Sequence, residues 1–114
     1  MSKRMKLPNG DASIVEMEKL RAYCLSPEHP RGRHKARVFY SLLGMTAAHA
    51  EELRAALIDA AIKENATPGT SDGYGVRYII DFELRHEERT ANIRSCWIVL
   101  SGEIAPRFVT CYIL

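Results

Sequence analysis

The sequence lacks the features of a membrane protein, a disulfide framework or a zinc-binding module. No apolar run approaches the roughly 18 residues that a membrane-spanning helix needs. Cys24, Cys96 and Cys111 are odd in number and have no Cys-x-x-Cys spacing, which predicts buried, reduced thiols. The basic N-terminus is not followed by an apolar segment, so no secretory signal is predicted. We therefore expect a cytoplasmic protein that does not act on a membrane.

The sequence also lacks the common catalytic motifs. It has no Gly-rich nucleotide loop, no nucleophile elbow and no recognisable Ser/His/Asp order. Asp81 and Glu83 lie two apart on a predicted strand, but no His, Asp or Glu partner has recognisable ligand spacing. Neither a metal nor an organic cofactor is expected. If the protein is an enzyme, phosphate-directed chemistry without a cofactor is what remains.

What the sequence does contain is the composition of one ordinary globular domain. Of its 114 residues, 46% are hydrophobic and 26% are charged, which is enough to form a hydrophobic core without disulfide bonds. We expect a single domain over residues 1–114. Its helical part is predicted over about 11–65 and its sheet part over about 74–114.

Helical periodicity dominates the first half of the chain. Residues 1–10 are predicted to be an extended lead-in that ends in a turn. A capping box at Ser13 and Glu16 opens the first predicted helix, and Gly44 closes the second. Between them, the prolines and glycine of SPEHPRG cannot continue a helix. The three predicted helices span residues 13–25, 33–43 and 46–65.

The hydrophobic period changes from about 3.6 to 2 after a predicted loop over residues 65–75. The segment VRYIIDFEL alternates apolar and polar residues, and the charged segment RHEERT predicts a hairpin connection. The predicted strands span residues 76–84, 91–100 and 107–114. Because helices come first and strands last, we expect an α+β fold, with N-terminal helices packed on a C-terminal antiparallel meander sheet of three or four strands.

The segment HPRGRHKARVF, residues 29–39, is the strongest functional signal. It holds four cations and two histidines with no acid. His34 and Lys35 fall in the first turn of the second helix, where cations are unfavourable by a few tenths to about 1 kcal/mol per charge unless an anion is bound. A phosphate would remove this conflict, and His34 and Arg37 are expected to share a helix face with Lys35 round the side. The candidate phosphate-binding residues are Arg31, Arg33, Arg37 and Arg77.

Metal-independent RNA cleavage needs a base, an acid and cations on the phosphate. His34 fits the base or the acid, and Lys35 fits the phosphate contact. Thr110 and Tyr112 are two apart on the last predicted strand and are expected to share a face with Phe108, where they could contact a phosphate, a ribose or a base. The simpler interpretation is a solvated basic loop and an ordinary strand surface.

The remaining histidines and the tryptophan are assigned structural or surface positions. His29 lies in the turn before the second helix and is predicted to be structural. His49 and His86 are expected to face solvent, on an outer helix turn and in the charged hairpin. Trp97 is expected in the core, although with Arg94 it could extend a binding surface.

Two blocks of the sequence carry a resemblance to a known family. LSPEHPRGRHKARVF, residues 25–39, is similar to an L-(N/S)-P-x-H-P-x-G-x-H-K-A-x-V-F block, and RFVTCYIL, residues 107–114, to an R-x-V-T-C-Y-x-L ending. Both are features of a bacterial domain family of unknown function, and the likeness covers nearly the whole chain. Members occur alone and at the C-termini of large polymorphic toxins, which implies a toxin or toxin–antitoxin role.

The order of helices before a sheet with a Thr-x-Tyr last strand is also similar to the ribonuclease-toxin superfold of barnase, the EndoU nucleases, colicins and RelE. This likeness implies that His34, Lys35, Thr110 and Tyr112 are active-site residues. The two-histidine arrangement of EndoU enzymes is absent, so the second acid or base is open, with Arg77 or Tyr112 as candidates.

The leading hypothesis is a toxin-type, metal-independent ribonuclease that cleaves RNA by internal 2′-hydroxyl attack. An acidic antitoxin or immunity protein that covers residues 29–37 would be its partner. The alternative is a non-catalytic binding module whose basic patch docks nucleic acid or an acidic protein. A third possibility is a phage- or defence-associated structural protein.

Overall fold

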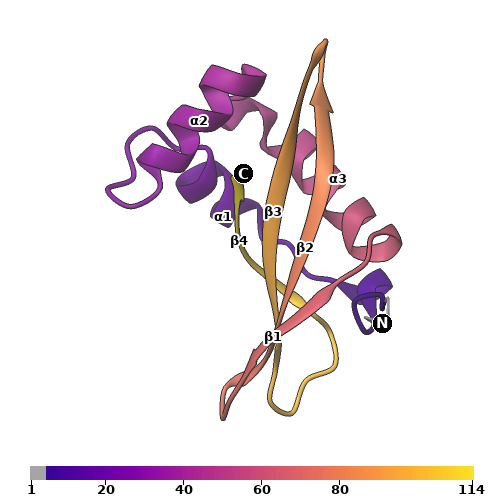
Figure 1. Ribbon diagram of the computed structural model, residues 1–114. Coiled ribbons are helices and arrows are strands. Elements are labelled where there is room, and N and C mark those ends of the chain that lie inside the picture. Colours follow the sequence, from indigo (N-terminus) through magenta and orange to yellow (C-terminus); the bar gives the residue numbers. More distant parts are fainter. Residues whose placement is uncertain (1–4) are drawn as a thin grey trace.

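Four antiparallel strands form one sheet in the computed structural model, which describes residues 5–114 (Figure 1). They lie side by side in chain order, so the predicted meander is confirmed. The first four residues of the predicted lead-in lie outside the described range. The strands are β1 (Thr67–Ser71), β2 (Gly75–His86), β3 (Arg89–Leu100) and β4 (Arg107–Ile113).

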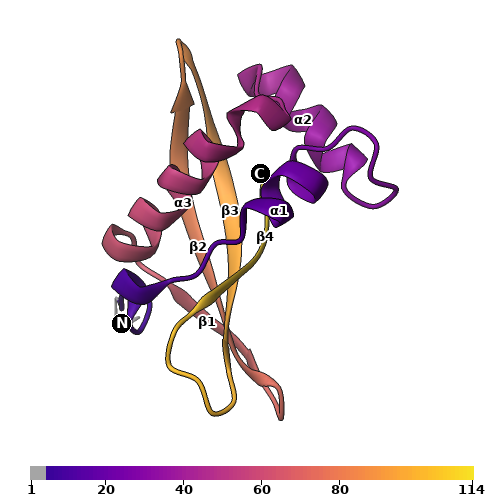
Figure 2. The same ribbon diagram turned by 180° about the vertical axis from the view of Figure 1, so that it is seen from behind.

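Within residues 5–114, three α-helices precede the sheet, which confirms the α+β fold with N-terminal helices. Helix α2 packs against β3 and β4, and α3 packs against β2. Figure 2 shows α3 crossing the face of the sheet obliquely and α1 beside β4, near the C-terminus. No helix within residues 5–114 is both long and apolar enough to cross a membrane. The segments are α1 (Met17–Lys19), which continues as a π-helical turn over Leu20–Cys24, α2 (Arg33–Leu43) and α3 (Ala50–Lys63).

The core lies between the helices and one face of the sheet. Trp97 is fully buried, as expected, and packs edge to face on Phe108 with ring centroids 5.6 Å apart. Its indole N–H donates to the hydroxyl of Ser95, which donates to the carbonyl of Ile80. These buried polar groups are therefore paired, as a stable core requires.

The start of the first helix differs from the prediction. Ile14 runs beside β4, where its N–H donates to the carbonyl of Pro106 at 2.8 Å and its carbonyl accepts from the N–H of Phe108 at 2.9 Å. These long-range bonds hold the chain extended after the 3-10 turn Gly10–Ala12, so the first α-helix begins only at Met17 and has no side-chain cap from Ser13.

Part of the predicted loop over residues 65–75 forms the edge strand β1 instead. All five residues of β1 are exposed. A strand with no buried side shows no hydrophobic alternation, so the sequence pattern carried no sign of it. Its backbone pairs with β2 through an irregular register between Pro68 and Ser71.

The expectation that His86 faces solvent is wrong. Strands β2 and β3 continue through the charged segment to a tight turn at Glu87, which has a φ of 56°. His86 thereby stays on the buried face, 6% exposed, with its Nδ1 2.6 Å from Oε2 of Glu52. Its ring also meets that of His49 edge-on, with centroids 4.6 Å apart, and His49 is half-buried.

Candidate functional site

Helix α2 carries the basic segment to strand β4. Lys35 Nζ donates to Oγ1 of Thr110 at 3.0 Å, across 75 positions of sequence, and lies 5.7 Å from the centre of the Tyr112 ring. His34, Lys35 and Tyr112 line one shallow hollow of about 350 Å³. The structure thus brings together the four residues that sequence patterns proposed as catalytic, two from α2 and two from β4.

The N-terminus of α2 has no side-chain cap because its N-cap residue is Gly32. A Cβ atom at Gly32 would overlap the carbonyl oxygen of Tyr23, so a larger capping residue does not fit there. His29 holds the preceding loop instead, since its Nδ1 accepts from the backbone N–H groups of Arg31 and Gly32 at 3.0 Å each. This agrees with the structural role expected for His29.

Tyr23 is a site residue that the sequence analysis missed. Its phenol oxygen accepts a second hydrogen bond from Lys35 Nζ at 3.3 Å, and its ring packs edge-on against His29. Tyr23 and Thr110 line a second hollow of about 510 Å³. The two hollows meet at the hydrogen bond between Lys35 and Thr110, because each contains one of its partners. No local pattern marks Tyr23, whose contact with Lys35 crosses a loop.

A β-bulge sets the direction of Thr110 and Tyr112. The β3–β4 register changes between Cys96 and Trp97, so that Phe108 lies opposite Trp97 while Thr110 lies opposite Cys96. One extra residue on β4 reverses the alternation of side chains at this point. Phe108 is therefore buried in the core, and the expectation that it shares a face with Thr110 and Tyr112 is wrong. Thr110 and Tyr112 do share a face.

Two buried thiols lie behind Thr110. Cys24 Sγ is 3.8 Å from Oγ1 of Thr110. A hydrogen bond with the Cys111 thiol, helped by the Cys111 backbone N–H, Thr110 and the charge of Lys35, lowers the pKa of Cys24 to about 6 against the effect of burial. The same bond, with burial, raises the pKa of Cys111. Neither thiol is exposed, so both can influence a ligand only through Thr110 or Lys35.

The other cations of the basic segment lie around the site rather than in it. Arg33 and Arg37 line a separate hollow of about 360 Å³ beside Tyr40 and Met45. Arg37 therefore does not share the face of α2 that His34 and Lys35 present to Tyr112, because the helix turns it toward the loop before α2. Arg31 is exposed in that loop.

The fold does not place Arg77 close to the other candidate site residues. Arg77 forms an ion pair with Asp72 at 2.8 Å. It also lies four positions along β2 from Asp81. Asp81 lies opposite Arg94 on β3, and Arg94 lies opposite Tyr112 on β4. Arg77 is therefore separated from Asp81 by about 13 Å along the strand. Its role in phosphate binding stays a prediction. Arg94 lies nearer, but two hydrogen bonds of 2.9 Å from it to Asp81 fix its side chain and raise its pKa.

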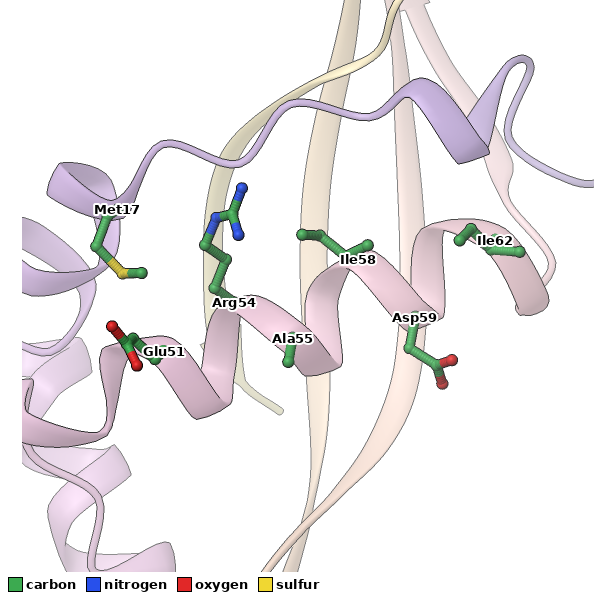
Figure 3. A pocket seen from close by; sticks show the side chains of 7 residues that line it. All are labelled: Met17, Glu51, Arg54, Ala55, Ile58, Asp59 and Ile62. Carbon is green, nitrogen blue, oxygen red and sulfur yellow. The ribbon is translucent and has the colours of Figure 1, made fainter.

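A further hollow, of about 520 Å³, lies on the outer face of α3 and contains none of the candidate residues (Figure 3). Figure 3 shows Arg54 reaching from α3 toward the segment before α1, where its Nε donates to the carbonyl of Val15 at 2.9 Å. Within residues 5–114, no three His, Cys, Asp or Glu side chains are grouped so that they could hold a metal ion.

Comparison with known proteins identifies the family. The model of a domain of unknown function, DUF6883, matches residues 6–114, and the chain belongs to this family. No curated protein matches it significantly. A solved structure of a contact-dependent growth inhibition toxin–immunity protein complex from Klebsiella pneumoniae 342 contains a similar chain, with 18% identity and a TM-score of 0.66. The alignment covers 90% of this chain and all of that one, and shows a shared fold.

Proposed function

We propose that this protein is a toxin-type, metal-independent ribonuclease that cleaves RNA by attack of a ribose 2′-hydroxyl on the adjacent phosphate. The observation that carries the proposal is the position of Lys35. Its ammonium group is fixed by Thr110 in an open hollow that it shares with His34 and Tyr112. The fold shared with a chain of a toxin–immunity complex supports a toxin role.

Lys35 is suited to stabilise a crowded, negatively charged phosphate. A lysine ammonium has three N–H donors. Thr110 and Tyr23 take two of them, which leaves one donor in a fixed direction for a phosphate oxygen. A donor held in place before the reaction stabilises developing charge without further reorganisation.

His34 is the candidate base. It is exposed on α2 and lines the same hollow as Lys35, so it can reach a bound ribose. Histidine is the side chain best suited to proton transfer near neutral pH. Tyr112, from the opposite wall, would stack on a base. The cations Arg31, Arg33 and Arg37, and for longer RNA Arg77, would contact flanking phosphates.

An acidic immunity protein is the proposed partner. None of the ion pairs within residues 5–114 involves the four cations of residues 29–37, so their charge is not compensated inside the fold. An acidic surface laid over this segment would compensate it and block access to His34. A complex structure in which His34 remains open to solvent would contradict this mode of inhibition.

The test is cleavage of total RNA and of tRNA in EDTA by the parent protein and the His34→Ala variant. We expect cleavage by the parent and a loss of about 100-fold or more in the variant, because the base is removed. The thermal unfolding curves of the two should coincide, since His34 is exposed. If neither protein forms product but both bind RNA with salt-dependent affinity, the protein is a binding module and the proposal is wrong.

A further inference from the structure

Cleavage by 2′-hydroxyl attack needs a second group, because the leaving 5′-oxygen must receive a proton. The sequence analysis gave Arg77 and Tyr112 as the candidates for this second group. Arg77 lies apart from the site and is paired with Asp72. Tyr112 lies in the same hollow as His34, whereas the leaving oxygen departs on the side of the phosphorus opposite the attacking oxygen.

We propose that Tyr23 donates the proton to the leaving 5′-oxygen, acting across Lys35 from His34. This assignment rests on the proposed function. The ammonium of Lys35 can only donate, so the phenol oxygen of Tyr23 accepts in their 3.3 Å contact and the phenolic hydrogen stays available. Accepting a bond from a cation also strengthens a hydroxyl as a donor.

The two hollows fit the two halves of such a substrate. The hollow with His34 and Tyr112 would hold the nucleoside that carries the attacking 2′-hydroxyl. The hollow with Tyr23 has one lysine, Lys19, and one acid, Glu18, and so suits an uncharged leaving nucleoside better than a second phosphate. The scissile phosphate would lie where they meet, against the free N–H of Lys35.

The proposed step conserves protons and bonds. The His34 imidazole takes the proton of the 2′-hydroxyl while the O2′–P bond forms. The P–O5′ bond breaks, and the phenolic proton of Tyr23 passes to O5′. The products are a 2′,3′-cyclic phosphate and a 5′-hydroxyl. Proton exchange with water then returns Tyr23 to the phenol and His34 to the neutral imidazole.

The test compares Tyr23→Phe with the parent on an oligoribonucleotide that spans a cut site and on the same oligonucleotide with sulfur in place of the leaving 5′-oxygen. Phenylalanine keeps the ring that packs on His29 and removes only the hydroxyl. A thiolate leaves without a proton. We therefore expect a loss in kcat of about 100-fold on the oxygen substrate and a loss of only a few fold on the sulfur substrate.

Thr110→Val is the matched control, because it removes the other hydroxyl that holds Lys35 and keeps the phenol. It should slow both substrates equally. If Tyr23→Phe also slows both equally, Tyr23 merely orients Lys35 and the assignment as donor is overturned; if it slows neither, Tyr23 has no role. A parent protein that cuts no RNA overturns the proposed function itself, so the two failures are distinguishable.

Discussion

Helices α3 and α2 begin in opposite ways. The entry to α3 follows the local rules for stability. A 3-10 turn, Ala47–His49, leads directly into α3, and Thr46 and His49 cap this turn reciprocally. The His49 ring accepts from the Thr46 backbone N–H, and the Thr46 hydroxyl accepts from the backbone N–H of Ala48. Glu51 and Glu52 then place negative charge beside the positive end of the helix dipole.

The entry to α2 breaks each of these rules. Its N-cap is Gly32, it has no acid in the first turn, and the first three helical residues are Arg33, His34 and Lys35. Cations at this end of a helix are unfavourable. A local sequence that opposes its own structure is expected where a functional site requires it. The comparison therefore separates a helix start that follows the local rules for stability from one whose positive charge, in the function we propose, a bound phosphate would balance.

The largest effect on RNA cleavage should come from removing the charge of Lys35 in the first turn of α2. Lys35→Met keeps an unbranched side chain, one atom shorter, and removes the ammonium group. We expect it to lower the rate of RNA cleavage by about 1000-fold, because a fixed donor to the transition state is lost.

The control for that variant is Lys63→Met, which removes a solvent-exposed lysine of α3 that pairs with Asp59. Its cleavage rate should equal that of the parent. Equal rates for Lys35→Met and the parent would show that the start of α2 is not a catalytic site and would break the comparison.

The next largest effect tests why α2 cannot carry a conventional cap. In Gly32→Ala the new Cβ would overlap the carbonyl oxygen of Tyr23, so backbone must move. We expect a loss of about 2 kcal/mol in the free energy of unfolding, measured in urea, together with slower cleavage because Tyr23 and Lys35 shift. Gly73→Ala is the control, since a Cβ there meets no atom within 4 Å. If both alanine variants unfolded alike, tight packing would not explain the missing cap.

Much of the fold could be predicted because most elements carry their pattern locally. Helix α2 and its end at Gly44 follow from sequence, and so do the alternating strands β2 and β3. The elements that failed depend on distant partners or show no pattern. Ile14 is held extended by β4, and β1 has no buried side to create a hydrophobic period.

The candidate site divides in the same way. His34 and Lys35 could be proposed because they lie at a helix start whose cations conflict with the helix dipole, and that conflict is visible in sequence. Thr110 and Tyr112 could be paired by alternation within β4. Tyr23 could not be found, because its link to Lys35 depends on how the loop folds back. Phe108 was predicted on the wrong face of β4, because strict alternation of side chains along a strand does not allow for a β-bulge.

The smallest expected effect is the most direct measure of the contrast between the two helix starts. Arg33→Glu gives α2 the acid that α3 already has, and Glu51→Arg gives α3 the cation that α2 carries. Each should change the free energy of unfolding by about 0.5 kcal/mol at low salt, Arg33→Glu upward and Glu51→Arg downward.

The cleavage rates of these two variants should not follow their stabilities. Arg33→Glu should weaken RNA cleavage, since it removes a cation that flanks the site, whereas Glu51→Arg should leave the rate unchanged because Glu51 lies in the hollow on the outer face of α3. The test measures the free energy of unfolding in urea and the cleavage rate for each of the two variants. If Arg33→Glu destabilised the fold, the charges at the start of α2 would already be satisfied within the protein, and the need for a bound anion would disappear. A gain in stability with a loss in cleavage would show that this helix start is held in an unfavourable state by the requirements of its ligand.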